Sequence, residues 1–405
     1  MKEDIYGERK VRIPWFRVLL IIVLLSLVGA VVASWKRWES DPPQVGLDRD
    51  FKALGRNPAV SVTVQDPGCG LKRVSVILKQ NGQSIPLIEE EYPAPAMSQF
   101  WKLGDRRPKN LDLEQLIAIK HTPKDGPATL EVSATDCSLG NFLRGNRFLL
   151  QHNFAFDTRP PRVEVLSGQH YINQGGSECV VYRVSPDAEV SGVQAGSNFF
   201  PGYPVAGADP NMKFALFAFA YNVDPKTSLK VVARDAAGNE ATAGFWYKLF
   251  PKKFRSSTVT IEDAFLQKVV PEILSRSTEV RDQGDLLKNF LEINNKLRQL
   301  NHATIRKISE KSQPQFLWKG AFLQLSNSQV ESLFADHRTY IYQGKVIDHQ
   351  DHVGFDLSVV QQYPIEAAND GVVIYADYLG IYGNCILIDH GYGLVSLYGH
   401  LSSID

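Results

Sequence analysis

The run of uncharged residues at 18–33, VLLIIVLLSLVGAVVA, constrains the fold of this chain more than any other segment. An apolar run of this length seldom lies on the surface of a soluble domain, and a helix needs about 20 such residues to span a bilayer. Ser34 and Trp35 extend the run, and basic residues precede it. We therefore predict a membrane anchor at residues 18–35, with residues 1–17 as a cytoplasmic tail and the later residues outside the cytoplasm.

A cleaved signal peptide is the alternative for this segment. Its apolar core would span only about 7–15 residues and would end at a small-residue cleavage site. Here Trp35, Lys36, Arg37 and Trp38 follow the apolar run. The anchor interpretation predicts a single-pass protein of the inner membrane, with its later domains in the periplasm or otherwise outside the cytoplasm.

The charge and the cysteine content limit which partners the chain can bind and in which cellular compartment it can lie. The formal net charge is zero, with 44 basic and 44 acidic residues, so the chain lacks the basic excess that nucleic-acid binding usually demands. Cys69 and Cys137 lie near opposite ends of one predicted module, where an exported protein can form a disulfide; two buried thiols are the alternative. Cys179 and Cys385 lie in apolar runs and are expected in the core.

Short β-rich runs follow a polar linker predicted at residues 36–56. Gly, Pro, Asn and Asp separate these runs, a spacing typical of antiparallel β-sandwiches. The DTRPP segment that starts at Asp157 divides them into two sets. We predict one sandwich at residues 57–157 and a second at residues 158–250.

The two predicted sandwiches share an ending. LEVSATDCSLGN, from Leu130 to Asn141, resembles LKVVARDAAGN, from Leu229 to Asn239, with one residue inserted. In both, an alternating strand enters a turn whose Asp and Gly-Asn suit positive φ. Recurrence at about a hundred residues indicates two copies of one unit. The ARDAAGN ending and the DTRPP start resemble bacterial immunoglobulin-like modules.

A helical spacer is predicted at residues 251–325. Leu and Ile recur at helical spacing between residues 286 and 308, which predicts one long helix or a helix pair. Pro271 is expected to interrupt an earlier helix.

Two further local signals follow the spacer. Ser328 to Glu331 has the spacing of a capping box, which predicts a short helix ending near Ala335. TYIYQGKVID then predicts a hairpin that turns at Gln343 and Gly344.

The sequence HQDHVGFDLS, at residues 349–358, carries the candidate site. His352 and Asp356 are four residues apart, so on a strand they would share a face with Gly354 between them. Glycine would leave space there for a metal ion, and imidazole and carboxylate are both zinc ligands. Catalytic zinc usually has three protein ligands and a water, so the pair alone also fits an ordinary surface loop.

The surrounding motifs are HVGFD, PIEAANDGVV and IDHGYGLVSLYGHLS, in that order. Over residues 345–405 they resemble the lysostaphin-type (LytM-like) zinc metallopeptidases, whose catalytic domain is a small antiparallel β-sheet. The resemblance implies a metallopeptidase domain at residues 326–405, with zinc as the cofactor and peptidoglycan as the substrate. By the same resemblance, His352 and Asp356 match two zinc ligands.

The other histidines near this stretch receive separate predictions. His400 matches a catalytic histidine of the family that polarises the scissile carbonyl or positions the water. His390 matches a structural His-Gly turn. His349 falls outside the family pattern and is expected to be exposed.

One part of the family pattern is missing. The family carries a later His-x-His that supplies the third zinc ligand and a second catalytic histidine, and no His-x-His occurs in this chain. We expect the sequence to be part of a longer protein, with a frame-shifted gene or a domain that has lost catalysis as the alternatives.

Together these patterns predict a mainly β protein. Its parts would be a transmembrane helix, two immunoglobulin-like β-sandwiches, a helical spacer and part of a metallopeptidase domain. The predicted function is a membrane-anchored zinc endopeptidase that cuts the peptide cross-links of peptidoglycan. One alternative is an inactive domain of the same fold that binds cell wall or activates another wall hydrolase. Another alternative is a structural protein in which the β-sandwiches, and not the C-terminal domain, carry the function.

Overall fold

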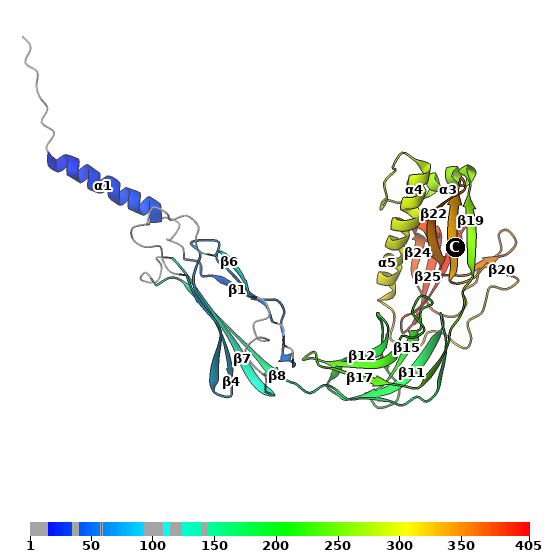
Figure 1. The fold of residues 1–405 in the computed structure, drawn as a ribbon, viewed down its shortest axis with the longest axis horizontal. Helices are drawn as coiled ribbons and strands as arrows, with labels where there is room; N and C mark the ends of the chain where they lie inside the picture. Colours follow the sequence, from blue (N-terminus) through cyan, green and yellow to red (C-terminus); the bar gives the residue numbers. More distant parts are fainter. Residues whose placement is uncertain are drawn as a thin grey trace, which may run out of the picture. The chain divides into compact units, whose positions relative to one another are not determined.

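The computed structural model describes residues 15–34, 40–56, 58, 60–92, 108–113, 124–138 and 144–405. The chain is mainly β, as predicted (Figure 1). It divides into two compact units. The first holds Met1–Arg162 with short pieces at Asp187–Glu189 and Arg234–Ala241, and the second holds the rest.

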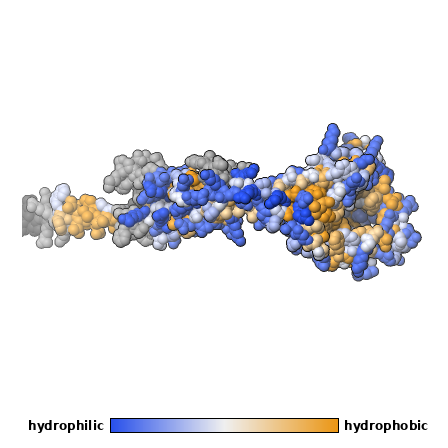
Figure 2. All heavy atoms as spheres, turned by 90° about the horizontal axis from the view of Figure 1, so that it is seen from below, coloured by the Kyte–Doolittle hydropathy of each residue, from blue (hydrophilic) through white to orange (hydrophobic). Residues whose placement is uncertain are grey.

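Helix α1 covers Trp15–Ser34 and overlaps the predicted anchor from residue 18 onward. The space-filling view colours this segment mainly as hydrophobic (Figure 2). Judged on the part of the chain that the structure describes, no helix is long and apolar enough to cross a membrane. The anchor at residues 18–35 stays a prediction.

The first unit contains two sheets that share one core; the smaller is antiparallel, and the larger is antiparallel except for one short parallel pair. The core side chains come from both sheets, and Val62, Val64, Val76 and Val132 are fully buried. Alternating burial along the strands produces this arrangement, because every second side chain faces the other sheet. The smaller sheet has the order β1 (Gln44–Leu47), β3 (Val62–Gln65), β6 (Asn110–Leu113). The larger has the order β2 (Ala53–Leu54), β8 (Arg147–Phe156), β7 (Gly126–Asp136), β4 (Leu71–Gln80), β5 (Gln83–Glu91).

Strands β1 and β2 lie inside residues 36–56, which the sequence predicts as a linker. β1 pairs with β3 from Gln44 to Leu47, and β2 pairs with the end of β8. Strand pairing therefore extends the first module into the predicted linker.

The cysteines fall into two classes. Cys69 and Cys137 form a disulfide across the ends of β4 and β7, with Cα atoms 5.6 Å apart, which confirms that prediction. Cys385 is fully buried as predicted, and burial raises the pKa of its thiol to about 11. Cys179, which was also expected in the core, is only half-buried because it lies on the face of its strand opposite the buried Val180 and Tyr182, although burial still raises its pKa.

The second predicted sandwich is built from two four-stranded sheets and a two-stranded one (Figure 1). The first four-stranded sheet has the order β14 (Tyr203–Pro204), β15 (Met212–Ala218), β11 (Ser177–Val184), β9 (Val163–Val165). The other has the order β13 (Asn198–Pro201), β12 (Ala188–Ala195), β16 (Leu229–Asp235), β17 (Glu240–Gly244). The two-stranded sheet pairs β10 (His170–Asn173) with β18 (Tyr247–Phe250) in parallel.

The shared ending of the two sandwiches reappears as a shared hydrogen-bonded corner. Asp235 accepts from the backbone N of Asn239 at 2.8 Å and from its Nδ2 at 2.9 Å. Asp136 accepts from the backbone N of Asn146 at 2.7 Å and from its Nδ2 at 3.0 Å. The sequence comparison matched Asn141 to Asn239, but Asn141 lies outside the described residues and Asn146 makes the equivalent contacts.

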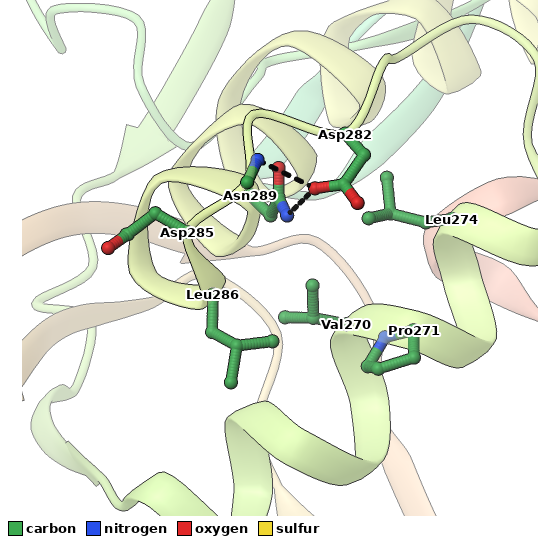
Figure 3. Close-up of a pocket in the computed structure, with 8 residues that line it drawn as sticks. Val270, Pro271, Leu274, Asp282, Asp285, Leu286 and Asn289 are labelled. Carbon is green, nitrogen blue, oxygen red and sulfur yellow. Dashed lines mark hydrogen bonds between the residues drawn. The ribbon is translucent and has the colours of Figure 1, made fainter.

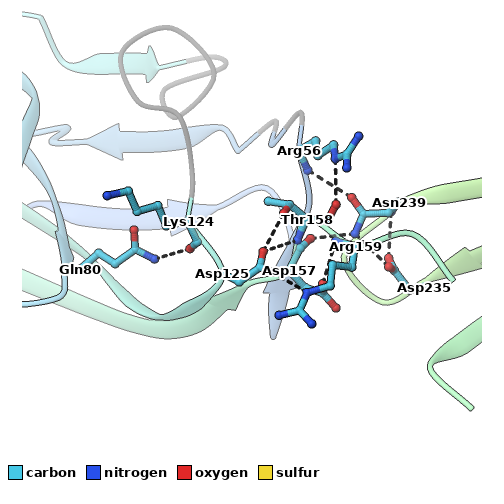
Figure 4. Close-up of polar contacts among 9 residues, drawn as sticks. All are labelled: Arg56, Gln80, Lys124, Asp125, Asp157, Thr158, Arg159, Asp235 and Asn239. Carbon is cyan, nitrogen blue, oxygen red and sulfur yellow. Dashed lines mark hydrogen bonds and ion pairs between the residues drawn. The ribbon is translucent and has the colours of Figure 1, made fainter.

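The Asn239 corner also holds the DTRPP segment within the first unit (Figure 4). Its Nδ2 donates to the carbonyl of Asp157 at 2.7 Å, and its Oδ1 accepts from the backbone N of Arg56 at 3.2 Å. Asp125 accepts from the backbone N and Oγ1 of Thr158 and from Nε of Arg159, and these bonds lower the pKa of Asp125 to about 2. The segment is therefore fixed by side chains on both sides of its backbone.

The predicted spacer holds α3 (Asp263–Arg276), α4 (Leu286–Glu292), a π turn η3 (Ile293–Leu297) and α5 (Arg298–Ser309). The last three run on without a break, so of the two predicted alternatives, one long helix or a helix pair, the long helix is the one present. The expected interruption at Pro271 is wrong, because α3 continues through it. Leu266 and Val270 are buried on α3, and this packing holds the helix together across the proline.

The C-terminal part is built around a hairpin of β21 (Asp336–Tyr342) and β22 (Lys345–His352). Its turn lies at Gln343 and Gly344, with φ of 48° and 75°, as predicted. The remaining strands are β19 (Ser256–Ile261), β20 (Gln329–Ser332), β23 (Asp356–Ser358), β24 (Val372–Tyr378), β25 (Asn384–Gly391) and β26 (Leu394–Leu401). β19 runs parallel to β21, and β24, β25 and β26 form a separate antiparallel sheet.

The helix predicted from Ser328 to Ala335 is wrong. β20 occupies this segment and pairs with β23 from Gln329 to Ser332. A capping-box spacing is a weak local preference, and a strand partner that is distant in sequence overrides it here.

We predict that Asn239→Ala destabilises the first unit by about 1–3 kcal/mol, because Asp235 and the backbone of Arg56 would lose buried partners. Denaturant unfolding followed by tryptophan fluorescence measures the change. Asn198→Ala, at an exposed position, is the matched control. Equal stability of the two variants would contradict the role assigned to the corner.

Candidate metal and catalytic site

The structure brings His352 and Asp356 together, although not on one strand. His352 ends β22, Asp356 begins β23, and the chain bends between them at Gly354. A Cβ added at Gly354 would meet nothing within 4 Å, so open space surrounds the bend. Nε2 of His352 lies 3.0 Å from Oδ1 of Asp356. The predicted shared strand face is wrong, but the predicted convergence of the two side chains is present.

A backbone carbonyl orients the His352 ring. Nδ1 of His352 donates to the carbonyl oxygen of Leu333 at 3.1 Å. Only a protonated nitrogen can make this bond, so in the neutral ring the lone pair is on Nε2, which faces Asp356. The His352 side chain is 18% exposed and that of Asp356 is 49% exposed, so the pair is open to solvent on one side.

An arginine that sequence reasoning missed holds the other oxygen of Asp356. Arg338, on β21, donates from its guanidinium to Oδ2 of Asp356 at 3.2 Å and to Oγ of Ser332 at 2.5 Å. Arg338 thereby fixes Oδ2 and leaves Oδ1 toward His352. Strand register was the available signal, since Arg338 lies on the strand that pairs with the one ending at His352.

Asp336 is a second acidic group that sequence reasoning missed. It is the cross-strand partner of His352 and is buried, with 2% of its surface exposed. Its Oδ2 accepts from Oγ of Ser257 at 2.7 Å, while its Oδ1 has no hydrogen-bond partner among the residues that the structure describes. The hairpin thus places a buried carboxylate on the strand next to the His352 end.

His400 lies on β26, in the sheet that β24 and β25 complete, and its side chain is exposed. Within the described residues, no hydrogen bond or ion pair joins it to His352 or Asp356. Its backbone has a positive φ of 58° beside Gly383. The predicted catalytic role of His400 stays a prediction.

His390 and His349 occupy contrasting positions. His390 is fully buried; its Nδ1 donates to the carbonyl of Asp370 at 2.7 Å and its Nε2 accepts from Oγ of Ser396 at 2.8 Å. Both ring nitrogens are therefore used within the fold, which supports the structural role predicted for His390. His349 is exposed, as predicted, with Nδ1 3.3 Å from Oγ1 of Thr339.

The donor set fits zinc only in part. Among the residues that the structure describes, no cluster of three or more His, Cys, Asp or Glu side chains could hold a metal ion. His352 and Asp356 nevertheless meet the requirements for two ligands. Their donor atoms converge, and a carbonyl fixes the imidazole tautomer, as hydrogen-bond partners of ligating histidines do in zinc sites.

Two hollows lie in the second unit. One, of about 430 Å³, lies over the β21–β22 hairpin and is lined by His337, Arg338, Thr339, His349, Gln350 and Asp351. The other, of about 410 Å³, lies between α3 and α4 (Figure 3). In the second, Asn289 binds the carboxylate of Asp282 and the backbone N of Gln283. Those bonds tie a loop to α4, so we assign that hollow a structural role.

Comparison with known proteins supports the assignment of this region. Residues 350–405 match the family model described as Peptidase family M23, which confirms the resemblance to this class of peptidase. The chain is also 40% identical over 54 residues to the DD-carboxypeptidase/endopeptidase Mpg of Neisseria meningitidis serogroup B and to that of Neisseria gonorrhoeae. Each match covers 13% of this chain and 13% of the relative, so the chain spans a small part of their length.

Solved structures resemble the chain only loosely. A titin fragment covers 55% of this chain and 72% of its own length at 14% identity, with a TM-score of 0.23. An ectodomain fragment of ICAM-5 covers 51% of this chain and 54% of its own length at 14% identity, with a TM-score of 0.21.

We predict that His390→Ala destabilises the second unit by about 1–3 kcal/mol, because the carbonyl of Asp370 and the hydroxyl of Ser396 would lose their partner in the core. His349→Ala, at an exposed site, should change stability by no more than about 0.5 kcal/mol. Thermal unfolding of both variants measures the difference. A larger loss for His349→Ala would reverse the roles assigned to the two histidines.

Proposed function

We propose that this protein is a zinc metalloendopeptidase that hydrolyses the peptide cross-links of bacterial peptidoglycan. The observation that carries the proposal is the 3.0 Å approach of His352 Nε2 to Asp356 Oδ1, inside the stretch that matches Peptidase family M23. Two relatives that match 54 residues of the chain are named DD-carboxypeptidase/endopeptidase Mpg, and this name supports a peptidase.

The residues of this chain take separate roles in the proposal. His352 and Asp356 would hold the metal, with the Leu333 carbonyl fixing the histidine tautomer and Arg338 holding the second carboxylate oxygen. Zinc bound there supplies a water of lowered pKa and polarises the amide carbonyl. His400 would stabilise negative charge that develops on that carbonyl oxygen.

The rest of the chain would place this site at the cell wall. In the proposal, residues 18–35 anchor the protein in the inner membrane as a single span, and the later residues lie in the periplasm or otherwise outside the cytoplasm. The two sandwiches would then separate the peptidase domain from the membrane. Their sheet pairs and the disulfide between Cys69 and Cys137 suit an exported spacer.

One contact favours a second candidate function. The guanidinium of Arg338 lies on Asp356 and balances the negative charge of this carboxylate without a metal ion. A domain of this fold that holds no metal, and instead binds the wall or activates another hydrolase, is the alternative that this contact favours.

Zinc content and wall hydrolysis test the proposal together. In a form of the protein that also carries a His-x-His motif, His352→Ala and Asp356→Ala should each lower zinc retention and hydrolysis of purified peptidoglycan toward background, because each removes a ligand. His400→Ala should retain zinc but lose rate by about 10²–10³-fold. Elemental analysis measures the metal, and release of soluble wall fragments measures the rate.

His349→Ala is the matched control, since this histidine is exposed and three residues from His352. Equal zinc content in the wild type and in His352→Ala would refute the ligand assignment. Wall binding without metal retention or hydrolysis by the wild type would favour the second candidate function.

The anchor has its own test. After cell lysis, the tagged protein should sediment with membranes and require detergent for release, because an apolar segment of about 20 residues partitions into the bilayer. Deletion of residues 18–35 should move the protein to the soluble fraction. Release of the wild type by high salt alone would contradict anchoring, and N-terminal sequencing that begins beyond residue 35 would indicate a signal peptide.

A further inference from the structure

The sheet of β10 and β18 turns aromatic side chains toward solvent. Burial alternates along β18 and the residues before it, so that Trp246, Lys248 and Phe250 are exposed while their neighbours are half-buried. On β10, Tyr171 and Asn173 are exposed while His170 and Ile172 are buried. Tyr171 pairs with Lys248, and Asn173 with Phe250. These five exposed residues form what we call the aromatic face.

The core does not require these rings. The opposite side of the sheet packs inward. There the ring centroid of His170 lies 5.0 Å from that of Phe245, which in turn lies 6.0 Å from the ring centroid of Phe217. On the aromatic face, Tyr171 is 53% exposed, Trp246 52% and Phe250 40%. The ring centroid of Tyr171 lies 5.5 Å from that of Trp246 and 6.4 Å from that of Phe250, so the three rings are neighbours. An exposed group of large aromatic side chains marks an interaction surface.

The charge beside the face has one sign. Lys248 lies over the Phe250 ring at 5.1 Å, and Lys252 lies over Phe254 at 5.7 Å. Lys253 and Arg255 follow and are exposed. No Asp or Glu occurs in residues 168–176 or 241–261, which include both strands of the face. A partner that carries negative charge therefore complements this surface.

The polar groups on the face narrow the class of partner. Asn173 offers an amide, and the Tyr171 hydroxyl donates to Oε1 of Gln169. Amides and phenols hydrogen-bond to hydroxyl groups, while aromatic rings pack against the apolar C–H faces of sugar rings. The exposed hydrophobic residues of β10 and β18 are aromatic and none is aliphatic, which suits a sugar chain better than the acyl region of a bilayer.

We propose that the aromatic face binds an anionic glycan, namely peptidoglycan strands whose peptide stems carry carboxylates. The sugar rings pack on Tyr171, Trp246 and Phe250, and Lys248 pairs with a carboxylate. The second sandwich is then a wall-binding module as well as a spacer. This inference rests on the proposed function only for the identity of the glycan.

Retention on insoluble purified peptidoglycan tests this binding. The full chain is kept in mild detergent and carries His352→Ala, so that neither hydrolysis nor the candidate metal site contributes to the result. The triple variant Tyr171→Ala, Trp246→Ala, Phe250→Ala should bind about tenfold or more weakly, since truncating central aromatic anchors costs this much in other interfaces. Lys248→Glu, which keeps every ring, should also weaken binding, and added salt should weaken the binding of the parent chain.

Phe199→Ala and Lys226→Ala, at exposed positions of the same module, are the matched controls and should bind as the parent does. Chitin, a neutral glycan, should retain the parent less than peptidoglycan does. Equal retention of the parent and both face variants on peptidoglycan would overturn the proposal. Displacement of the parent by micelles that contain phosphatidylglycerol would also overturn it, in favour of a membrane surface. Because the readout is binding, loss of the proposed peptidase activity would leave it unaffected.

Discussion

The antiparallel pairing of β21 with β22 is the interaction on which the candidate site depends. This pairing places Asp336 across from His352 and puts Arg338 on the neighbouring strand, within reach of Asp356. The tight turn at Gln343 and Gly344 sets where the pairing begins, and a bulge near Tyr340 shifts its register. A slip of one residue would move every side chain to the other face of the hairpin and separate these groups.

The second sandwich braces this hairpin from outside. Tyr221, which follows β15, donates to Oδ2 of Asp351 at 2.9 Å and packs against the rings of Phe254 and Phe334. Burial, followed by the bond to Asp351, raises the pKa of Tyr221 to about 12, so the phenol keeps the proton that makes this bond. Gly175 completes the contact, since a Cβ there would lie 3.1 Å from the Phe334 ring. The sandwich thus fixes the residue that precedes His352, in addition to any spacing role.

Local sequence signals predicted the features whose causes are local. Alternating apolar residues gave the strands of both sandwiches, Gln343-Gly344 gave the hairpin turn, and the Leu and Ile spacing gave the long helix. Local signals gave wrong predictions where interactions between distant segments determine the structure. The capping-box spacing at Ser328 predicted a helix, but this segment forms β20 and pairs with β23. Pro271 was expected to interrupt α3, but the packing of Leu266 and Val270 keeps the helix continuous.

The site shows the same division between local and distant causes. His352 and Asp356 could be selected from their spacing. They meet, however, because the chain bends at Gly354, and the alternation of side chains along a strand does not predict a bend. Arg338 and the Leu333 carbonyl could not be found by motif, because neither lies in the motif and each reaches the site through strand pairing. In the same way, the partner of Asp136 proved to be Asn146, which lies five residues beyond the Asn141 that the sequence comparison matched.

Arg338 decides how this site can work, because a carboxylate has two oxygens and here each has a separate neighbour. Oδ2 of Asp356 accepts from Arg338, and Oδ1 faces the imidazole of His352. If Arg338 stays on Oδ2 when a metal arrives, it acts as an outer partner that orients the ligand, as hydrogen-bonded carboxylates do in metal sites. If the metal must displace it, the lost ion pair lowers metal affinity. The open side of the pair, with Asp356 half exposed, lets a metal approach Oδ1 without moving Arg338. The geometry therefore favours the orienting role, in which the arginine and the metal share one carboxylate through different oxygens.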